Sequence, residues 1–227
     1  MQNIKEFIQN NLKESLNILD DLFEDNELAY YSSQCKNELQ IRDKIAWRMH
    51  KALNKEYGND NLYVVRREWA PEGSGREKVD LAVLEMNAAK EKVKCAIALI
   101  EFKAQSIARP EKWYVDEFEH DVKKMRGLKK SYSKCCANAD MYFVFLERGQ
   151  ECESVKYKSI LGYVYQGDKI VYHENSDYLS IIKKHWDGFK NAFPTENIEI
   201  HEPKAICIGE AFDCKQYVSP LLIGPLK

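Results

Sequence analysis

Hydrophobic positions in the first quarter of the chain recur every three to four residues. Residues 4–23 carry such a pattern, and residues 33–57 repeat it until Gly58-Asn59-Asp60-Asn61 interrupts it. This spacing is typical of amphipathic helices, and a glycine beside polar turn-forming residues marks the end of one. The sequence therefore predicts two successive helices before the first strand.

Short apolar runs of the kind found in strands follow. They occupy residues 62–69, 79–84 and 95–103, and polar connectors separate them. A helical pattern over 113–132 leads to a continuous apolar run over 141–146, as expected for a strand buried on both faces. We therefore expect a hairpin of the second and third strands, and a right-handed parallel crossover to the fourth.

The rest of the chain continues this alternation. Residues 161–166 and 169–173 flank Gly167-Asp168, which is a turn signal for a hairpin. A helix is predicted over 176–193 and one more strand over 205–208, before an end punctuated by proline and glycine.

No repeat or linker divides the chain. The prediction is therefore a single α/β domain over residues 1–227. Its core lies at about 33–146, and a C-terminal extension occupies 147–227.

Composition limits the function classes. The 227 residues are 44% hydrophobic and 31% charged, which suits a folded domain, and no stretch approaches the roughly 20 apolar residues of a bilayer span. The N-terminal residues lack the apolar core of a secretory signal, and the seven cysteines, without any CxxC, suggest reduced thiols. We expect a cytoplasmic protein with no membrane partner.

Charged residues within the apolar strands carry the most specific chemical signal. Glu101-Phe102-Lys103 ends an apolar run, where the two-residue period puts Glu101 and Lys103 on one face and Phe102 on the other. Asp80 begins the preceding run. A similar triplet, Asp121-Val122-Lys123, lies mid-helix, where residues two apart point to different faces, so we set it aside.

An antiparallel hairpin would bring these charges to one end of the sheet. A register that pairs Asp80 with Glu101 also pairs Leu84 with Ile97. Mg²⁺ or Mn²⁺ would compensate the carboxylates, and a lysine beside the cation, its pKa depressed by the cation and by burial, could position or deprotonate a water. The alternative is a structural Asp–Lys–Glu ion-pair cluster that needs no metal.

Asp80, followed after twenty residues by Glu101-Phe102-Lys103, resembles the signature of the PD-(D/E)XK, or restriction-endonuclease-like, nuclease superfamily. Val79 stands where the proline that names the motif would be. The order of the predicted elements over residues 33–146 also resembles the αβββαβ core of this superfamily. The resemblance implies a mixed central sheet, here with an extra N-terminal helix and a C-terminal αβ extension.

The resemblance also implies roles for individual residues. Asp80 and Glu101 would ligate Mg²⁺ together with the backbone carbonyl of Phe102, and Lys103 would act on the nucleophilic water. Gln105 continues the face of Glu101 and Lys103, so it either touches substrate or water or is a plain polar strand end.

Many members of this superfamily place a further acid on the first core helix. Glu38 is the first choice here and Asp43 the second. An ordinary surface pair of Glu38 with Arg42, four residues on, is an equal alternative for Glu38.

The distribution of charge along the chain is compatible with a nucleic-acid partner. The net charge is only −2, but it combines a balance of −5 over residues 1–31 with +4 over 36–55 and +4 over 102–134. Local basic groups, and not the average charge, bind phosphate backbones. The expected contacts are Arg67, Arg76, Lys123 and Lys124.

The sequence thus predicts a Mg²⁺-dependent endonuclease that hydrolyses phosphodiester bonds of DNA in restriction, defence or DNA processing. RNA is not excluded as a substrate, and a homodimer would suit cleavage of both strands. The alternative is a non-catalytic nuclease-like module that binds nucleic acid or a protein partner.

Overall fold

The computed structural model describes residues 3–33, 37–58, 62–75, 77–106, 110–152, 163–166, 169–172, 178–194, 198–199, 205–211 and 214–226. Its main sheet has seven strands in the order β1-β2-β3-β4-β9-β7, and β8 pairs with β9. The strands are β1 (Tyr63–Trp69), β2 (Val79–Met86), β3 (Val93–Ser106), β4 (Asp140–Cys152), β7 (Ile198–Glu199), β8 (Ile206–Ala211) and β9 (Cys214–Leu226). Among the described strands of this sheet, β3 and β4 are the only parallel pair, so the predicted α/β fold with a mixed sheet is confirmed.

The N-terminal helices are more broken than expected. The structure has α1 (Ile4–Asn17), the 3₁₀ helix η1 (Asp20–Leu22), α2 (Glu27–Ser33) and α3 (Glu38–Tyr57). The seven-residue α2 was not predicted, because a helix this short owes its stability to packing, here on β8, more than to its own sequence. In contrast, α3 buries Ile41, Ile45 and Met49 at helical spacing and ends at Gly58, whose φ is +76°.

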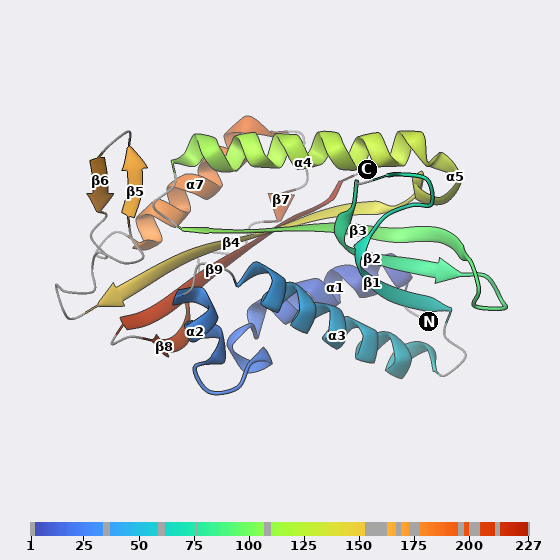
Figure 1. The fold of residues 1–227 in the computed structure, drawn as a ribbon, viewed down its shortest axis with the longest axis horizontal. Coiled ribbons are helices and arrows are strands. Elements are labelled where there is room, and N and C mark those ends of the chain that lie inside the picture. Colours follow the sequence, from blue (N-terminus) through green and yellow to red (C-terminus); the bar gives the residue numbers. More distant parts are fainter. Residues whose placement is uncertain are drawn as a thin grey trace.

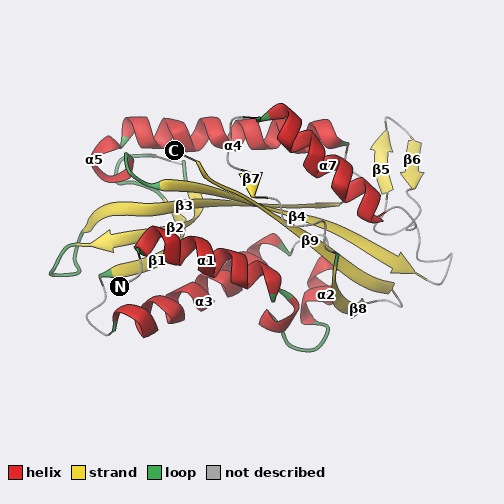
Figure 2. Ribbon diagram, turned by 180° about the vertical axis from the view of Figure 1, so that it is seen from behind, coloured by secondary structure: helices red, strands yellow, loops and turns green. Residues whose placement is uncertain are grey.

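Helices cover both faces of the sheet (Figures 1 and 2). On one face α1, α2 and α3 pack over a core that includes Leu12, Ile45 and Val144. On the other, α4 (Glu111–Ser131), α5 (Ser133–Cys136) and α7 (Tyr178–Ala192) enclose a second core around Phe118, Phe145 and Trp186. Because α4 connects β3 to β4, the predicted strand–helix–strand unit with parallel strands is present.

The strand β9 corrects the sequence prediction, which placed no strand after residue 208. It pairs antiparallel with β4 from Met141↔Leu226 to Cys152↔Cys214, so it is a central strand. Pro220 and Gly224 argued against a strand in the sequence pattern, because both residues normally weaken the hydrogen bonding between strands. Gly224 sits close to Met141, beside an irregularity in the register, at a φ of +125°.

The predicted hairpin of the C-terminal half is present. β5 (Tyr163–Gln166) and β6 (Lys169–Tyr172) form it as a separate sheet beyond α7 (Figure 1). Cys214 is disulfide-bonded, so the expectation of reduced thiols throughout is wrong at this position. Within the described part of the chain, no helix has both the length and the apolar character needed to cross a bilayer.

Candidate active site

Asp80 and Glu101 lie on adjacent antiparallel strands at one end of the sheet. Leu81 of β2 pairs with Ile100 of β3, and one further step brings Asp80 opposite Glu101. The Asp80 Oδ2 accepts a hydrogen bond of 2.8 Å from the backbone N–H of Phe102. The predicted juxtaposition of the two carboxylates is therefore present, and the charge of Asp80 contributes to raising the pKa of Glu101.

The rest of the predicted register is wrong by one residue. Leu84 pairs with Ala96 and not with Ile97, because the ladder shifts between Val83 and Leu84. Such a bulge inserts one unmatched residue into a strand. It lies toward the hairpin turn, so it leaves the Asp80 end of the sheet in the expected register.

Glu38 reaches the same end of the sheet from the first turn of α3. Its Oε2 accepts a hydrogen bond of 2.9 Å from the backbone N–H of Ala104. Burial raises the pKa of Glu38, the Ala104 hydrogen bond opposes this change, and the charge of Asp80 adds to it. The acid expected on the first core helix is thus beside Asp80.

The ion pairs distinguish between Glu38 and Asp43 as the acid that α3 brings to the site. Within the described residues, Arg42 forms its ion pairs with Asp43, at 2.9 Å, and with Glu68, at 3.3 Å. Asp43 also binds Arg67. Asp43, the second choice as the helix acid, therefore belongs to an arginine network, and Glu38 is not engaged in the simple surface pair with Arg42.

Glu101 is a buried carboxylate with a lysine as its counter-ion. Its side chain is 3% exposed, and the Nζ of Lys124 on α4 lies 2.6 Å from its Oε1. Burial, followed by the nearby charge of Asp80, raises the pKa of Glu101 to about 8, although Lys124 opposes the rise. Lys124, expected as a nucleic-acid contact, instead lies against the proposed metal ligand and is 23% exposed.

Lys103 faces α4 as well. Its Nζ lies 3.4 Å from Asp121 Oδ2 and 3.5 Å from Glu117 Oε2. Burial by itself would lower the pKa of Lys103, but the carboxylates around it, foremost Asp121 and Glu117, outweigh burial and raise it. Without a cation the pKa of Lys103 is therefore raised, and its depression by a bound cation stays a prediction.

Asp121 is a site residue that the sequence analysis set aside. It is 1% exposed, its Oδ1 lies 3.9 Å from the Nζ of Lys124, and burial raises its pKa. A signal was available, because Asp121 falls on the apolar face of α4 with Phe118 and Met125. We call Glu38, Asp80, Glu101, Lys103, Asp121 and Lys124 the charged cluster.

The side chains of Phe102 and Gln105 occupy opposite faces of β3. The Phe102 side chain is fully buried in the α1–α3 core, as its position in the strand predicted. Gln105 pairs in register with Glu147 of β4, and its Oε1 accepts a hydrogen bond of 3.0 Å from the N–H of Ser106. This local bond favours the strand-end interpretation of Gln105.

Glu147 continues the face of Glu101 and Lys103 onto β4. It is fully buried, its Oε1 lies 3.2 Å from the Nδ1 of His185 on α7, and burial raises its pKa. The sequence analysis did not single out this pair. Its signal is Glu147 following Phe143 and Phe145 at the two-residue period of a buried strand.

The other expected nucleic-acid contacts form their ion pairs with residues outside the cluster. Arg67 is exposed on β1, and Lys123 is exposed on α4, where it pairs with Glu119 at 3.3 Å. Arg76 lies outside the described residues.

The donor atoms suit a hard cation, although the protein does not enclose one. Among the described residues, no group of three or more histidine, cysteine, aspartate or glutamate side chains could hold a metal ion. Mg²⁺, however, is commonly bound through one or two carboxylates, with waters and substrate phosphates filling its other positions. Asp80 and Glu101 supply such a pair, and the raised pKa of Glu101 reflects its burial and the nearby charge of Asp80.

Comparison of the chain with protein-family models, with curated proteins and with solved structures found no match. The chemistry of the charged cluster therefore has to carry the functional conclusion.

Proposed function

We propose that this protein is a Mg²⁺-dependent nuclease of the PD-(D/E)XK type that hydrolyses phosphodiester bonds of DNA. The observation that carries the proposal is the meeting of Glu38, Asp80 and Glu101, from one helix and two strands, at one end of a mixed sheet. Three carboxylates in so small a region are costly without a cation, and the order of helix, three strands, helix and strand supports the same assignment.

Asp80, Glu101 and the backbone carbonyl of Phe102 would hold the metal. When bound, Mg²⁺ would supply positive charge that stabilises the phosphoryl group during hydrolysis. Its charge would also offset the burial and the repulsion from Asp80, which together raise the pKa of Glu101.

Lys103 acts as a cation in this proposal. Because its pKa is raised, it keeps its proton, orients the attacking water and balances negative charge on the phosphate. Glu38 is the better proton acceptor, because burial brings the pKa of its carboxyl closer to neutrality.

The test is cleavage of plasmid DNA, single-stranded DNA and RNA with Mg²⁺ or Mn²⁺. We expect Asp80→Asn and Glu101→Gln each to lower the rate by about 10²–10⁴-fold, the usual range for such groups. Glu119→Gln removes an exposed carboxylate of α4 and serves as the matched control. The proposal is contradicted if the wild type cleaves none of these substrates, or if Asp80→Asn cleaves them as fast as the wild type.

One observation favours the second candidate, a non-catalytic nuclease-like module. Lys124 and Lys103 already provide Glu101 and Asp121 with cationic partners, so the charged cluster can be a structural network. Nucleic-acid binding without cleavage, unchanged by Mg²⁺, would support this function.

A further inference from the structure

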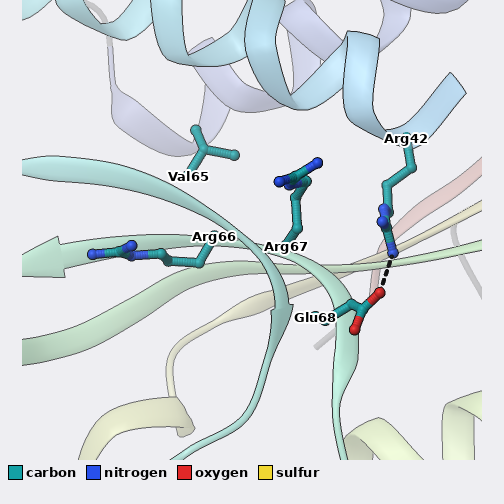
Figure 3. Close-up of a pocket in the computed structure, with 5 residues that line it drawn as sticks. All are labelled: Arg42, Val65, Arg66, Arg67 and Glu68. Atoms are coloured by element: carbon teal, nitrogen blue, oxygen red, sulfur yellow. Dashed lines mark hydrogen bonds and ion pairs between the residues drawn. The ribbon is translucent and has the colours of Figure 1, made fainter. Parts of the chain in front are cut away.

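Arg42 follows Glu38 by one turn of α3, yet the two side chains form no ion pair in the described part of the structure. Residues four apart on a helix are neighbours, and an acid and a base at this spacing commonly pair. The Nη1 of Arg42 instead lies 3.3 Å from Glu68 Oε1 on β1. This contact borders a pocket of about 530 Å³ between α3 and β1 (Figure 3). The pairing that the sequence spacing favours is thus replaced by one between two elements.

The backbone at Glu68 brings its carboxylate to Arg42. Successive side chains of a regular strand point to opposite faces, so Glu68 should lie on the face opposite to Arg67. Arg67 reaches Asp43 on α3. Glu68 nevertheless reaches the same helix, at Arg42 (Figure 3). Two consecutive side chains can meet one helix because Glu68 has a φ of +48°, which is uncommon for a residue other than glycine.

The packing of β1 shows the same reversal. Val65 packs against the core under α3, whereas Trp69 packs against the core under α4. Residues four apart on a regular strand share a face, so the alternation is reset between these two. Glu68 has also left the ladder with β2, in which its register position is opposite Asp80. Because like charges directly opposite each other destabilise a sheet, the reversal separates two carboxylates as well.

The charges beside α3 balance only when Glu68 is included. The Nε of Arg42 donates a hydrogen bond of 3.0 Å to Asp43 Oδ1, and Arg67 binds the other oxygen of that carboxylate. One carboxylate is thus shared by two guanidinium groups, and Glu68 supplies the second negative charge. Without Glu68 one positive charge would be left over, and Glu38 is a carboxylate one helical turn away from it.

The carboxyl of Glu38 depends on this separation if it is to accept a proton. Burial raises its pKa, and the charge of Asp80 adds to the rise. The Ala104 N–H, Lys103 and Arg42 oppose it, Arg42 least of the three. A guanidinium in direct contact would stabilise the carboxylate and lower the pKa of Glu38, which would make it a weaker base.

We propose that Glu68 is a positioning residue, which holds Arg42 away from Glu38 and so leaves the Glu38 carboxyl able to accept a proton. Its strained backbone is kept because the carboxylate is needed at Arg42. The inference rests on the proposed function for the role of Glu38 as proton acceptor, whereas the arrangement of the three side chains is testable without cleavage.

The experiment follows the carboxyl signal of Glu38 by carbon NMR in full-length protein labelled at its glutamates, during a pH titration in EDTA. Glu38→Gln identifies the signal by its loss. In Glu68→Gln the proton affinity of Glu38 should fall about threefold to tenfold, because Arg42 turns to it. Adding Arg42→Met should restore this affinity. Arg42→Met alone should change it less than about twofold, because Glu68 already holds Arg42 elsewhere.

Two further variants separate this role from a structural one. Glu68→Gly accepts a positive φ without strain, so its urea midpoint should be no lower than that of wild type, while Glu38 titrates as in Glu68→Gln. A purely structural Glu68 would lower the midpoint and leave Glu38 unchanged. Glu56→Gln removes the same charge from an exposed position about 21 Å along α3 from Arg42, and Glu38 should titrate there as in wild type.

Equal titration of Glu38 in wild type and Glu68→Gln would overturn the inference, even where the wild type cleaves DNA. A shift in Glu68→Gln that persists after Arg42→Met is added would overturn it too, because Glu68 would then act by another route. The expected shift and its reversal, in a protein that cleaves no substrate, would leave Glu68 as the residue that holds Arg42 and would overturn the nuclease.

Discussion

Replacing Glu101 with glutamine tests the electrostatics of the cluster directly. Glu101 is 3% exposed, and its pKa is raised from 4.5 to about 8 by burial and by Asp80. Between these two pH values the folded protein holds a proton that the unfolded chain has lost. The free energy of unfolding therefore falls as the pH rises through this window.

The size of the effect follows from the shift. At about 1.4 kcal/mol per pKa unit, ionising Glu101 in the folded protein costs about 5 kcal/mol at most. Relaxation around the charge reduces what is observed, so we expect a change of about 2–5 kcal/mol. Glutamine keeps the shape of the side chain but carries no charge, so Glu101→Gln should lose this pH dependence.

The assay is urea unfolding in EDTA at several pH values from 4.5 to 8.5. Wild type and Glu101→Gln should differ little at the acid end, and the variant should be the more stable protein at pH 8.5. Mg²⁺ at 100 times its Kd should restore about 2.7 kcal/mol to wild type at pH 8.5 and less to the variant. The exposed control Glu119→Gln should follow wild type.

Stability curves of wild type and Glu101→Gln that run parallel across this range would refute the reasoning. Glu101 would then titrate as an ordinary carboxylate. Its burial against Lys124 would carry no electrostatic cost, and the argument that the site needs a cation would fail.

Three further outcomes are expected. Lys103→Arg should keep the cleavage rate within about tenfold of wild type, and Lys103→Ala should lower it about 10²-fold or more, because the proposed role needs a charge and not a base. Equal losses of single-turnover rate in the two variants would contradict this role. Lys124→Met should bind Mg²⁺ more tightly in calorimetry, since it removes the ammonium that competes for Glu101, and unchanged affinity would place the metal elsewhere. Gly224→Ala should lower the free energy of unfolding by about 1–3 kcal/mol, because its Cβ would lie 2.5 Å from the carbonyl oxygen of Met141 at a φ of +125°; an unchanged urea midpoint would rule out that strain.

The helices and strands of residues 38–146, apart from the short α5, follow from local periodicity, and the sequence was sufficient to predict them. The same periodicity did not predict the structure where pairing between strands far apart in the sequence determines it. β9 contains Pro220 and Gly224 and is a strand because β4 offers it a partner along most of its length. The shift between Val83 and Leu84 is likewise invisible in the pattern, because a bulge depends on how two strands settle against each other.

The site was predictable as far as the strands determine it. The two-residue period and one register placed Asp80 beside Glu101, and Glu38 was implied by the resemblance to the nuclease superfamily. The contribution of α4 was not predictable in this way, because which turn of α4 lies over β3 depends on tertiary packing. That packing brings Asp121 and Lys124 to the cluster, and the carboxylates of α4 raise the pKa of Lys103, which burial alone would lower.

The pairing of β4 with β9 has a consequence for how the protein folds. The two strands are separated in sequence by the β5–β6 hairpin and α7, so the loop between them must close before the apolar edge of β4 is covered. Until then that edge, which includes Phe143 and Phe145, can pair with another chain. Substitutions that weaken β9 should therefore appear first as aggregation during synthesis, while the molecules that do fold retain their function.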